Sequence, residues 1–140
     1  MKQTDKKGAK NQIGAYGEEI ACNYVRNKGF KVISQNYLKK WGEIDIVARE
    51  TMDNKGKVHF IEVKTVSYET KQDLNNAVSH GTWRPEENVH GKKLLRLQRT
   101  IETWIAEHNY EGDWQIDIAS VRVVPREKYA TIMMLYNVII

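Results

Sequence analysis

The spacing of apolar side chains along the chain predicts two helices. The first covers about Gln12 to Lys28 and is followed by Gly29, a residue type that commonly ends helices. The second covers about Val89 to His108. The two apolar faces consist of Ile13, Tyr16, Ile20, Ala21 and Tyr24 in the first helix and Leu94, Leu97, Ile101, Trp104 and Ile105 in the second. Each helix therefore has one side that must be buried against another element.

Runs of apolar and β-branched residues predict five strands. They are expected at Lys31–Tyr37, Glu43–Arg49, Lys57–Thr65, Trp114–Val124 and Tyr129–Val138. Turn-forming residues at 52–56 indicate that the second and third strands form a hairpin. The order of helix, three strands, helix and two strands predicts an α/β domain with a mixed central sheet flanked by helices. Residues 66–88 show no period, and we expect a long surface loop there, of a length that is often functional.

Length and charge narrow the class of protein. A chain of 140 residues suffices for one domain with one core, which we place at residues 12–140. Residues 1–11 contain four lysines and are expected to form a flexible basic tail. The net charge of +4 permits an anionic partner such as nucleic acid without requiring one.

Cysteine content and hydropathy predict a cytoplasmic protein. Cys22 is the sole cysteine, which excludes an intrachain disulfide and a zinc site built from cysteines. The first seven residues contain no apolar stretch, so we expect no signal peptide. The most apolar segment, Ile132 to Ile140, is interrupted by Asn137 and is far shorter than the ~18 residues that a membrane span needs. We therefore expect no interaction with membranes.

Three ionisable side chains interrupt the apolar strands in the middle of the chain. Asp45 lies within the run GEIDIVA, and Glu62 and Lys64 lie within FIEVK. Because alternate side chains of a strand share a face, Glu62 and Lys64 point the same way as Phe60. If the two strands pair as a hairpin, Asp45 can lie on that face as well, about 5 Å from its neighbour across the strands. Carboxylates this close repel each other, and a divalent cation turns the repulsion into a binding site.

The oxygen atoms available there suit a hard metal ion. Asp45, Glu62 and the main-chain carbonyl of Val63 would bind Mg²⁺ or Mn²⁺ in preference to zinc or copper. Lys64 is then placed either to hold and polarise an attacking water or to neutralise charge on a phosphate. The alternative is a half-exposed sheet on which Glu62 and Lys64 form a surface ion pair of little energetic value.

The order of several short sequence blocks resembles a known family. An Asp, about sixteen residues and then Glu-x-Lys, preceded by an amphipathic helix that carries Glu, is similar to the PD-(D/E)XK motif of the restriction-endonuclease-like superfamily. Archaeal Holliday-junction resolvases belong to that superfamily. More narrowly, the chain resembles the YraN family of predicted nucleases from Gly14 onward. The blocks that carry this resemblance are GAYGEEIA (14–21), GF (29–30), Asn36, GEIDIVA (42–48) and FIEVKT (60–65).

The resemblance implies both a fold and an activity. The fold is a restriction-endonuclease-like αβββαβ core, and the activity is that of a Mg²⁺-dependent endonuclease acting on DNA, with structured or branched DNA as one substrate class. The residues that match the family's active site are Glu18, Asp45, Glu62 and Lys64. Glu18 also lies at the border of the first helix's apolar face, from which its side chain can turn towards the sheet. The alternative for Glu18 is an acid that is merely favourable near a helix N-terminus.

The chain departs from the family pattern at a few positions. Ile44 stands where the superfamily motif has proline, although YraN-like sequences also have an aliphatic residue there. Leu38 stands where YraN-like sequences commonly have arginine, and residues 90–91 stand where they tend to have Thr-Pro. These departures concern contacts with the substrate and not the metal site.

Basic residues of the second predicted helix suggest a contact with phosphates. Its outer half carries Lys92, Lys93, Arg96 and Arg99, and Arg84 lies in the loop before it. We expect these side chains to bind the DNA backbone without reading its sequence. The alternative is an ordinary solvated helix face.

Other polar residues receive no catalytic role. The four histidines lack the spacing of metal ligands, and Asp117 is expected to be structural or to lie behind the site. Glu43 is expected on the strand face opposite Asp45, next to a basic partner.

Three functions are compatible with these features. The first is a metal-dependent nuclease, and the second is a non-catalytic nucleic-acid-binding module on the same fold. The third is a protein-interaction domain that uses Trp83 in the long loop. The combination of acids and lysine favours the nuclease, and the sequence leaves open whether the chain forms a homodimer.

Overall fold

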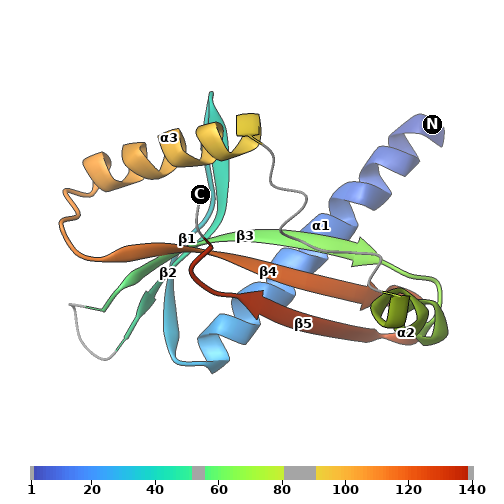
Figure 1. Cartoon of the computed structure of the whole chain (residues 1–140). Coiled ribbons are helices and arrows are strands. Elements are labelled where there is room, and N and C mark those ends of the chain that lie inside the picture. The colour runs from blue at the N-terminus through green and yellow to red at the C-terminus, as the bar shows by residue number, and fades with distance from the viewer. Residues whose placement is uncertain (1, 52–55, 81–90, 139–140) are drawn as a thin grey trace.

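In the computed structural model, which describes residues 2–51, 56–80 and 91–138, five strands form one mixed sheet in the order β1-β2-β3-β4-β5 (Figure 1). β3 and β4 are parallel, and the other neighbouring strands are antiparallel. The strands are β1 (Phe30–Lys39), β2 (Gly42–Glu50), β3 (Val58–Ser67), β4 (Trp114–Val124) and β5 (Tyr129–Leu135). The predicted mixed sheet is confirmed, and it is compatible with a restriction-endonuclease-like core.

Helices cover both faces of this sheet (Figure 1). They are α1 (Lys2–Asn27), α2 (Lys71–His80) and α3 (Gly91–Glu107), and a 3₁₀ turn, η2 (Pro125–Glu127), precedes β5. α1 packs across β1 to β4, whereas α3 packs on the opposite face, chiefly against β2. No helix in the described part of the chain is both long and apolar enough to cross a membrane.

Two segments differ from the predicted elements. Residues 2–11, expected to be a flexible tail, are the first turns of α1, which begins ten residues before the predicted start. Part of the predicted surface loop at 66–88 is the helix α2. The last residues of the predicted loop, 81–88, lie outside the described ranges. α2 begins where the Thr70 hydroxyl accepts a hydrogen bond from the N–H of Asp73 at 3.1 Å, and it buries Leu74 against the body.

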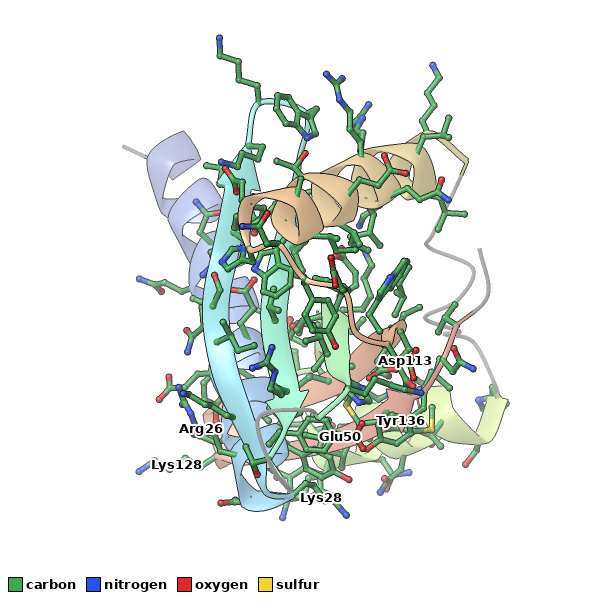
Figure 2. All side chains as sticks on the ribbon, turned by 90° about the vertical axis from the view of Figure 1, so that its left-hand side faces the viewer. Arg26, Lys28, Glu50, Asp113, Lys128 and Tyr136 are labelled. Carbon is green, nitrogen blue, oxygen red and sulfur yellow. The ribbon has the colours of Figure 1, made fainter. Side chains whose placement is uncertain are left out.

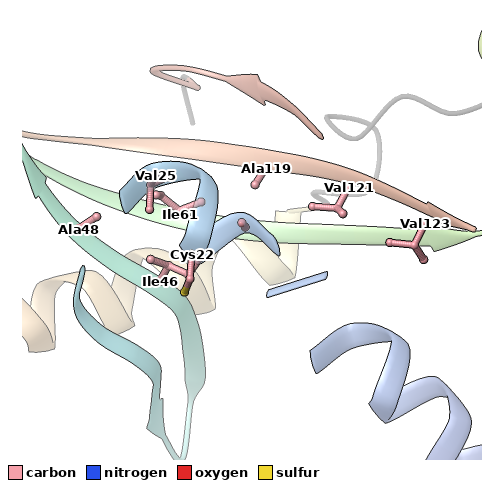
Figure 3. Packing of buried hydrophobic residues seen from close by; sticks show 9 residues of the cluster. Cys22, Val25, Ile46, Ala48, Ile61, Ala119, Val121 and Val123 are labelled. Atoms are coloured by element: carbon pink, nitrogen blue, oxygen red, sulfur yellow. The ribbon is translucent and has the colours of Figure 1, made fainter. Parts of the chain in front are cut away.

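The α1 face of the sheet packs with small side chains. Its buried cluster consists of Ala21, Cys22, Val25, Ile46, Ala48, Ile61, Ala119, Val121 and Val123 (Figure 3). Three of these residues are alanines, one each from α1, β2 and β4. Gly17 continues the pattern, because a Cβ at this position would overlap the side chain of Thr65 on β3. These small residues allow α1 to lie close to the strands.

The α3 face packs with larger side chains. Its buried cluster consists of Ile44, Val47, Val58, Phe60, Leu97, Ile101, Trp104 and Ile116. The Phe60 and Trp104 rings meet edge to face, with centroids 5.3 Å apart. Burying each such side chain contributes about 1.5–3 kcal/mol, so this cluster holds α3 on the sheet.

Candidate functional site

Asp45 lies at the point where β2 separates from β3. The ladder between the two strands ends at the pair Ile46–Ile61. Two residues beyond Ile61, the N–H of Val63 donates to the side chain of Asp45, at 2.8 Å from Oδ2. The alternation of apolar residues also breaks here, because Ile44 packs in the α3-side cluster and Ile46 in the α1-side cluster. β2 therefore twists at Asp45 and makes room for a side chain between the strands.

Glu62 and Lys64 follow the alternation predicted for β3. Val63 packs towards the α1-side cluster, so Glu62 and Lys64 point to the side of α3. There Glu62 Oε1 lies 3.1 Å from Lys93 Nζ and 3.6 Å from Lys64 Nζ. The side chains of Glu62 and Lys64 are only 11% and 17% exposed, so the alternative of a surface ion pair on an open sheet is wrong.

Two further acids join Asp45 from α1 and β2. Carboxylate oxygens of Glu18, Glu43 and Asp45 lie within 4.8 Å of one another. The Asn36 amide, in the orientation that satisfies its hydrogen bonds, donates to Glu18 at 3.1 and 3.2 Å and to Glu43 Oε1 at 3.1 Å. Asn36 has a left-handed backbone (φ 53°), which asparagine accepts more readily than most residues. We call the space between Glu18, Glu43, Asp45 and Glu62 the acidic cleft.

The prediction for Glu43 was wrong. It was expected on the face opposite Asp45, but residues two apart in a strand share a face. The same rule that placed Glu62 beside Lys64 therefore places Glu43 beside Asp45, and the structure shows the two carboxylates in one cluster. This was the site residue that a consistent reading of the alternation would have found.

The acidic cleft is open to solvent as two adjoining hollows. One has a volume of about 500 Å³ and extends from α1 along β3. The other, of about 300 Å³, extends between β2 and α3, next to Arg96. Asp45, Glu62 and Lys93 line both hollows. A third, more apolar hollow of about 450 Å³ lies between α1 and η2, away from these carboxylates, and we assign it no part in the chemistry.

Burial and mutual repulsion disfavour the charged forms of the acids. Burial, followed by the charge of Glu62, raises the pKa of Asp45 to about 9, although the N–H of Val63 opposes the shift. The pKa of Glu18 is raised as well, mainly by burial and further by Glu43 and Glu62, against the hydrogen bonds from Asp45 and Asn36. The raised pKa values mean that the surrounding protein does not stabilise the ionised forms of these acids. A bound cation would stabilise them, so such pKa shifts are expected of a cation site.

The donor atoms fit a hard divalent cation. The carboxylates and the main-chain carbonyl of Val63 offer only oxygen atoms as ligands, and the hollows leave space for water. Oxygen ligands together with water suit Mg²⁺ or Mn²⁺. Lys64 stands beside this set. Burial, followed by the neighbouring Lys93, lowers the pKa of Lys64. Burial also acts to lower the pKa of Lys93, but the contacts of Lys93 with Lys64 and Glu62 outweigh burial and raise this pKa.

The predicted phosphate-binding residues divide into several groups. Lys93 turns into the acidic cleft, and Arg96 lines its α3 side. Lys92 is exposed on the outer face of α3, and Arg99 lies 4.4 Å from the centroid of the Trp41 ring. Arg84 and Trp83 lie outside the described residues.

Comparison with known proteins places the chain in a family. The family described as "Uncharacterised protein family UPF0102" matches residues 17–121, three quarters of the chain. This chain belongs to the UPF0102 family. The match extends from α1 to β4 and includes all four acids of the acidic cleft together with Lys64 and Lys93.

Relatives from three bacterial genera match most of the chain and most of their own length. A UPF0102 protein of Campylobacter lari is 34% identical over 110 residues, which cover 78% of this chain and 82% of the relative. A UPF0102 protein of Nocardia farcinica is 32% identical over 84% of this chain and 82% of the relative. A UPF0102 protein of Thermotoga petrophila is 33% identical over 77% of this chain and 82% of the relative. The predicted resemblance to a YraN-like family is thereby confirmed at the level of the family.

A second polar cluster of this UPF0102 chain lies at the other end of β3. The ring of His59 bonds through Nδ1 to Asp117 Oδ2 at 2.6 Å and through Nε2 to Glu50 Oε2 at 3.1 Å. Asp117 Oδ1 also accepts from the N–H of Asn137 at 2.9 Å, so it holds the segment after β5 against β4. Glu50 and Tyr136 mark this end of the molecule, far from the tip of the β1–β2 hairpin (Figure 2). Asp117 thus has a structural role, which is one of the two roles that the sequence predicted for it.

His59 makes the stability of the protein depend on pH. Burial disfavours its charge, but the hydrogen bonds and charges of Asp117 and Glu50 outweigh burial and raise the pKa of His59 above 6.5. A raised histidine pKa stabilises the fold at pH values below about 6.5, and this contribution is lost as the pH rises through the raised value. We expect the melting temperature of His59→Gln to lie further below that of the wild type at pH 6 than at pH 9, as measured by circular dichroism. An equal difference at both pH values would contradict a protonated His59.

Proposed function

We propose that this chain is a metal-dependent nuclease that hydrolyses phosphodiester bonds in DNA. The observation that carries the proposal is the acidic cleft, in which carboxylates from α1, β2 and β3 meet around a buried, protonatable Asp45 and two lysines. Support also comes from the resemblance of Asp45, Glu62 and Lys64 to the PD-(D/E)XK motif. The family description assigns no activity.

Each residue of the cleft has a role that its position supports. Asp45, Glu62 and the Val63 carbonyl would hold Mg²⁺, and Glu18 and Glu43 would bind its remaining ligands or a second ion. A bound Mg²⁺ lowers the pKa of a coordinated water and polarises a phosphoryl oxygen. Lys64 would orient the attacking water or neutralise the phosphate, since its Nζ lies at the edge of the carboxylate set.

Lys93 and Arg96 would position the scissile phosphate. Lys93 reaches Glu62 from α3, and Arg96 lines the adjoining hollow together with Glu43. Cations at these positions neutralise phosphate oxygens without distinguishing bases, so the proposal includes no sequence specificity.

The alternative of a non-catalytic DNA-binding module is less consistent with the site. Acids that line a cleft repel phosphates unless protons or a cation neutralise them. A module that only bound DNA would gain affinity by losing these acids. The acids therefore support a function in which metal and DNA are held together.

The experiment that tests the proposal is a cleavage assay with chelator-treated protein. Labelled linear, nicked and four-way-junction DNA are incubated with Mg²⁺, with Mn²⁺ or with EDTA. We expect cleavage with either metal and none with EDTA, and the loss of cleavage in Asp45→Ala. Absence of cleavage of every substrate, or undiminished cleavage by Asp45→Ala, would refute the nuclease.

Two neighbouring acids of α1 provide a matched test of whether Glu18 has a specific role in the site or acts only through its charge. Glu18 points into the acidic cleft, whereas its neighbour Glu19 on α1 is exposed and outside it. We expect Glu18→Gln to lower the cleavage rate about tenfold or more and to weaken Mn²⁺ binding in calorimetry. Glu19→Gln removes the same charge and should match the wild type in both measurements. Equal effects of the two substitutions would exclude a specific role for Glu18.

A further inference from the structure

A separate hollow lies between β1, β2 and the C-terminal end of α3, the end from which the chain continues towards β4 (Figure 1). Its volume is about 360 Å³, within the range of pockets that bind small molecules. We call it the basic hollow and define it by five of its lining residues, Lys31, Arg49, Trp104, His108 and Tyr110.

The basic hollow is distinct from the acidic cleft. None of its described lining residues lines either hollow of that cleft. Lys93, which turns into the cleft, lies near the start of α3, and Trp104 lies about 16 Å further along the helix axis. A ligand of the basic hollow would therefore be held by residues that take no part in the proposed metal site.

Two cations stand side by side in the basic hollow. Lys31 on β1 and Arg49 on β2 are register partners, so their side chains share a face, with Cβ atoms about 5 Å apart. This is the α3 face, because Val47, two residues before Arg49, packs in the α3-side cluster. Like charges directly opposite each other in a sheet are destabilising. No acid is among the described lining residues, and neither cation forms an ion pair with a described residue.

Nitrogen atoms around the basic hollow also lack hydrogen-bond partners. Arg49 Nε is buried and has no partner among the described residues, while the guanidinium lies 5.7 Å from the centroid of the Tyr110 ring. His108 Nδ1 donates to the carbonyl of Trp104 at 2.8 Å, because a carbonyl oxygen only accepts. This bond leaves His108 Nε2 without a partner in the described part of the chain. The hollow thus combines two uncompensated positive charges with an imidazole nitrogen that donates when the ring is protonated.

We propose that the basic hollow binds the phosphate group of a nucleotide through Lys31, Arg49 and His108. A phosphate monoester carries up to two negative charges and three acceptor oxygens, so it can neutralise both cations and accept from all three side chains. A carboxylate has one charge and two oxygens and would leave a cation unpaired. The aromatic rings of Tyr110 and Trp104 line the same hollow, and they provide an apolar wall for the remainder of the nucleotide.

Two sources carry this phosphate group. One is a free nucleotide, and the other is the terminal phosphate of a DNA strand. The proposal concerns the phosphate that both share, and it does not depend on the proposed nuclease because no residue of the acidic cleft takes part.

Titration calorimetry in EDTA tests the site without a metal in the acidic cleft. The probes are deoxyadenosine 5′-monophosphate (dAMP) and deoxyadenosine, which lacks the phosphate. We expect the wild type to bind dAMP at least about tenfold more tightly than deoxyadenosine. Lys31→Gln should weaken dAMP binding about tenfold or more, because it loses a charge-assisted hydrogen bond. Lys40→Gln removes an exposed lysine at the turn of the same hairpin, outside the hollow, and should match the wild type.

Nuclear magnetic resonance places the bound nucleotide in the hollow. The indole N–H signal of Trp104, assigned by its absence in Trp104→Phe, should shift when dAMP is added to the wild type and stay in place in Lys31→Gln. The indole N–H signal of Trp114, which lies outside the hollow, should not shift in either protein. Without ligand, the melting temperature of Lys31→Gln should be no lower than that of the wild type, because Lys31 is exposed and its removal relieves the repulsion from Arg49.

Single-stranded DNA of one sequence, with either a 5′-phosphate or a 5′-hydroxyl, distinguishes the two sources. A preference for the phosphorylated strand that Lys31→Gln abolishes would identify the DNA end as the ligand. Equal binding of the two strands, together with Lys31-dependent binding of dAMP, would identify a free nucleotide. Either result upholds the phosphate site.

Two results would overturn it. The first is that neither dAMP nor the phosphorylated strand binds more tightly than its counterpart without phosphate. The second is that Lys31→Gln binds them as tightly as the wild type does. Because none of these measurements involves cleavage, the phosphate site can fail while the nuclease stands, and the nuclease can fail while the phosphate site stands.

Discussion

Asp45→Asn is expected to abolish Mg²⁺-dependent cleavage and, at the same time, to raise the melting temperature of the metal-free protein. Cleavage should fall on the order of 10³-fold or more, because the variant loses a ligand charge that no neighbour replaces. The asparagine oxygen can still accept the hydrogen bond that Asp45 Oδ2 receives from Val63. The change therefore removes a buried charge and keeps the backbone contact.

The stabilisation follows from the direction of the pKa shift. The pKa of Asp45 is raised from 3.8 to about 9 by burial and by the charge of Glu62. Between these values the folded protein holds a proton that the unfolded chain has released, so the stability of the wild type falls as the pH rises from about 4 to 9. Asparagine has no such dependence, and the advantage of Asp45→Asn should grow across this range. A gain of about 1 kcal/mol corresponds to roughly 2–4 °C in a chain of this size.

Differential scanning calorimetry in EDTA at several pH values measures this gain. Glu111→Gln provides the control, because Glu111 is exposed in the turn before β4 and lies outside the acidic cleft. It should change neither the melting temperature nor the cleavage rate. A melting temperature of Asp45→Asn below that of the wild type would show that Asp45 is a stabilising core residue and not a strained ligand.

Trp104→Ala is expected to be the most destabilising single substitution that we consider, at about 3–5 kcal/mol. Trp104 is 2% exposed, and its ring meets Phe60 edge to face at 5.3 Å and stacks on His108 at 4.1 Å. Its removal leaves a cavity between α3 and the sheet. Because α3 carries Lys93 and Arg96, the DNA binding that we propose should weaken together with stability.

Urea unfolding of two companion variants makes this prediction specific. Trp114→Ala removes the same side chain from a position that is 40% exposed and should cost less than half as much. Trp104→Phe retains a ring and removes an indole N–H that has no hydrogen-bond partner among the described residues, so its cost should stay below about 1.5 kcal/mol. Equal costs for Trp104→Ala and Trp114→Ala would show that α3 is not held by its buried face.

Periodicity predicted the apolar part of the fold and missed the polar parts. The second helix and all five strands lie within a few residues of their predicted positions, because each buries an apolar face. The first turns of α1 contain no such face, and they extend a helix that is already formed. α2 was missed although Thr70 and Asp73 have the spacing of a helix cap, because the surrounding residues are polar.

The sequence predicted the positions of site residues that are fixed by one strand alone. It did not predict positions that depend on how several elements pack together. The alternation along β3 placed Glu62 and Lys64 on one side, and the structure agrees. The twist of β2 at Asp45 depends on packing against two different helices, which no local pattern contains. Lys93 was expected on the outer half of α3, but its long side chain reaches Glu62 beneath the helix.

The alanines between α1 and the sheet have a consequence for how relatives can diverge. Ala21, Ala48 and Ala119 set the thickness of this layer, and Glu18 is carried on the helix that rests on it. A valine at any of the three positions would move α1 away from the sheet. The carboxylate of Glu18 would then move away from the other acids of the cleft, although none of these acids is substituted. In the metal site that we propose, cation preference would therefore change through methyl groups that never touch the ion.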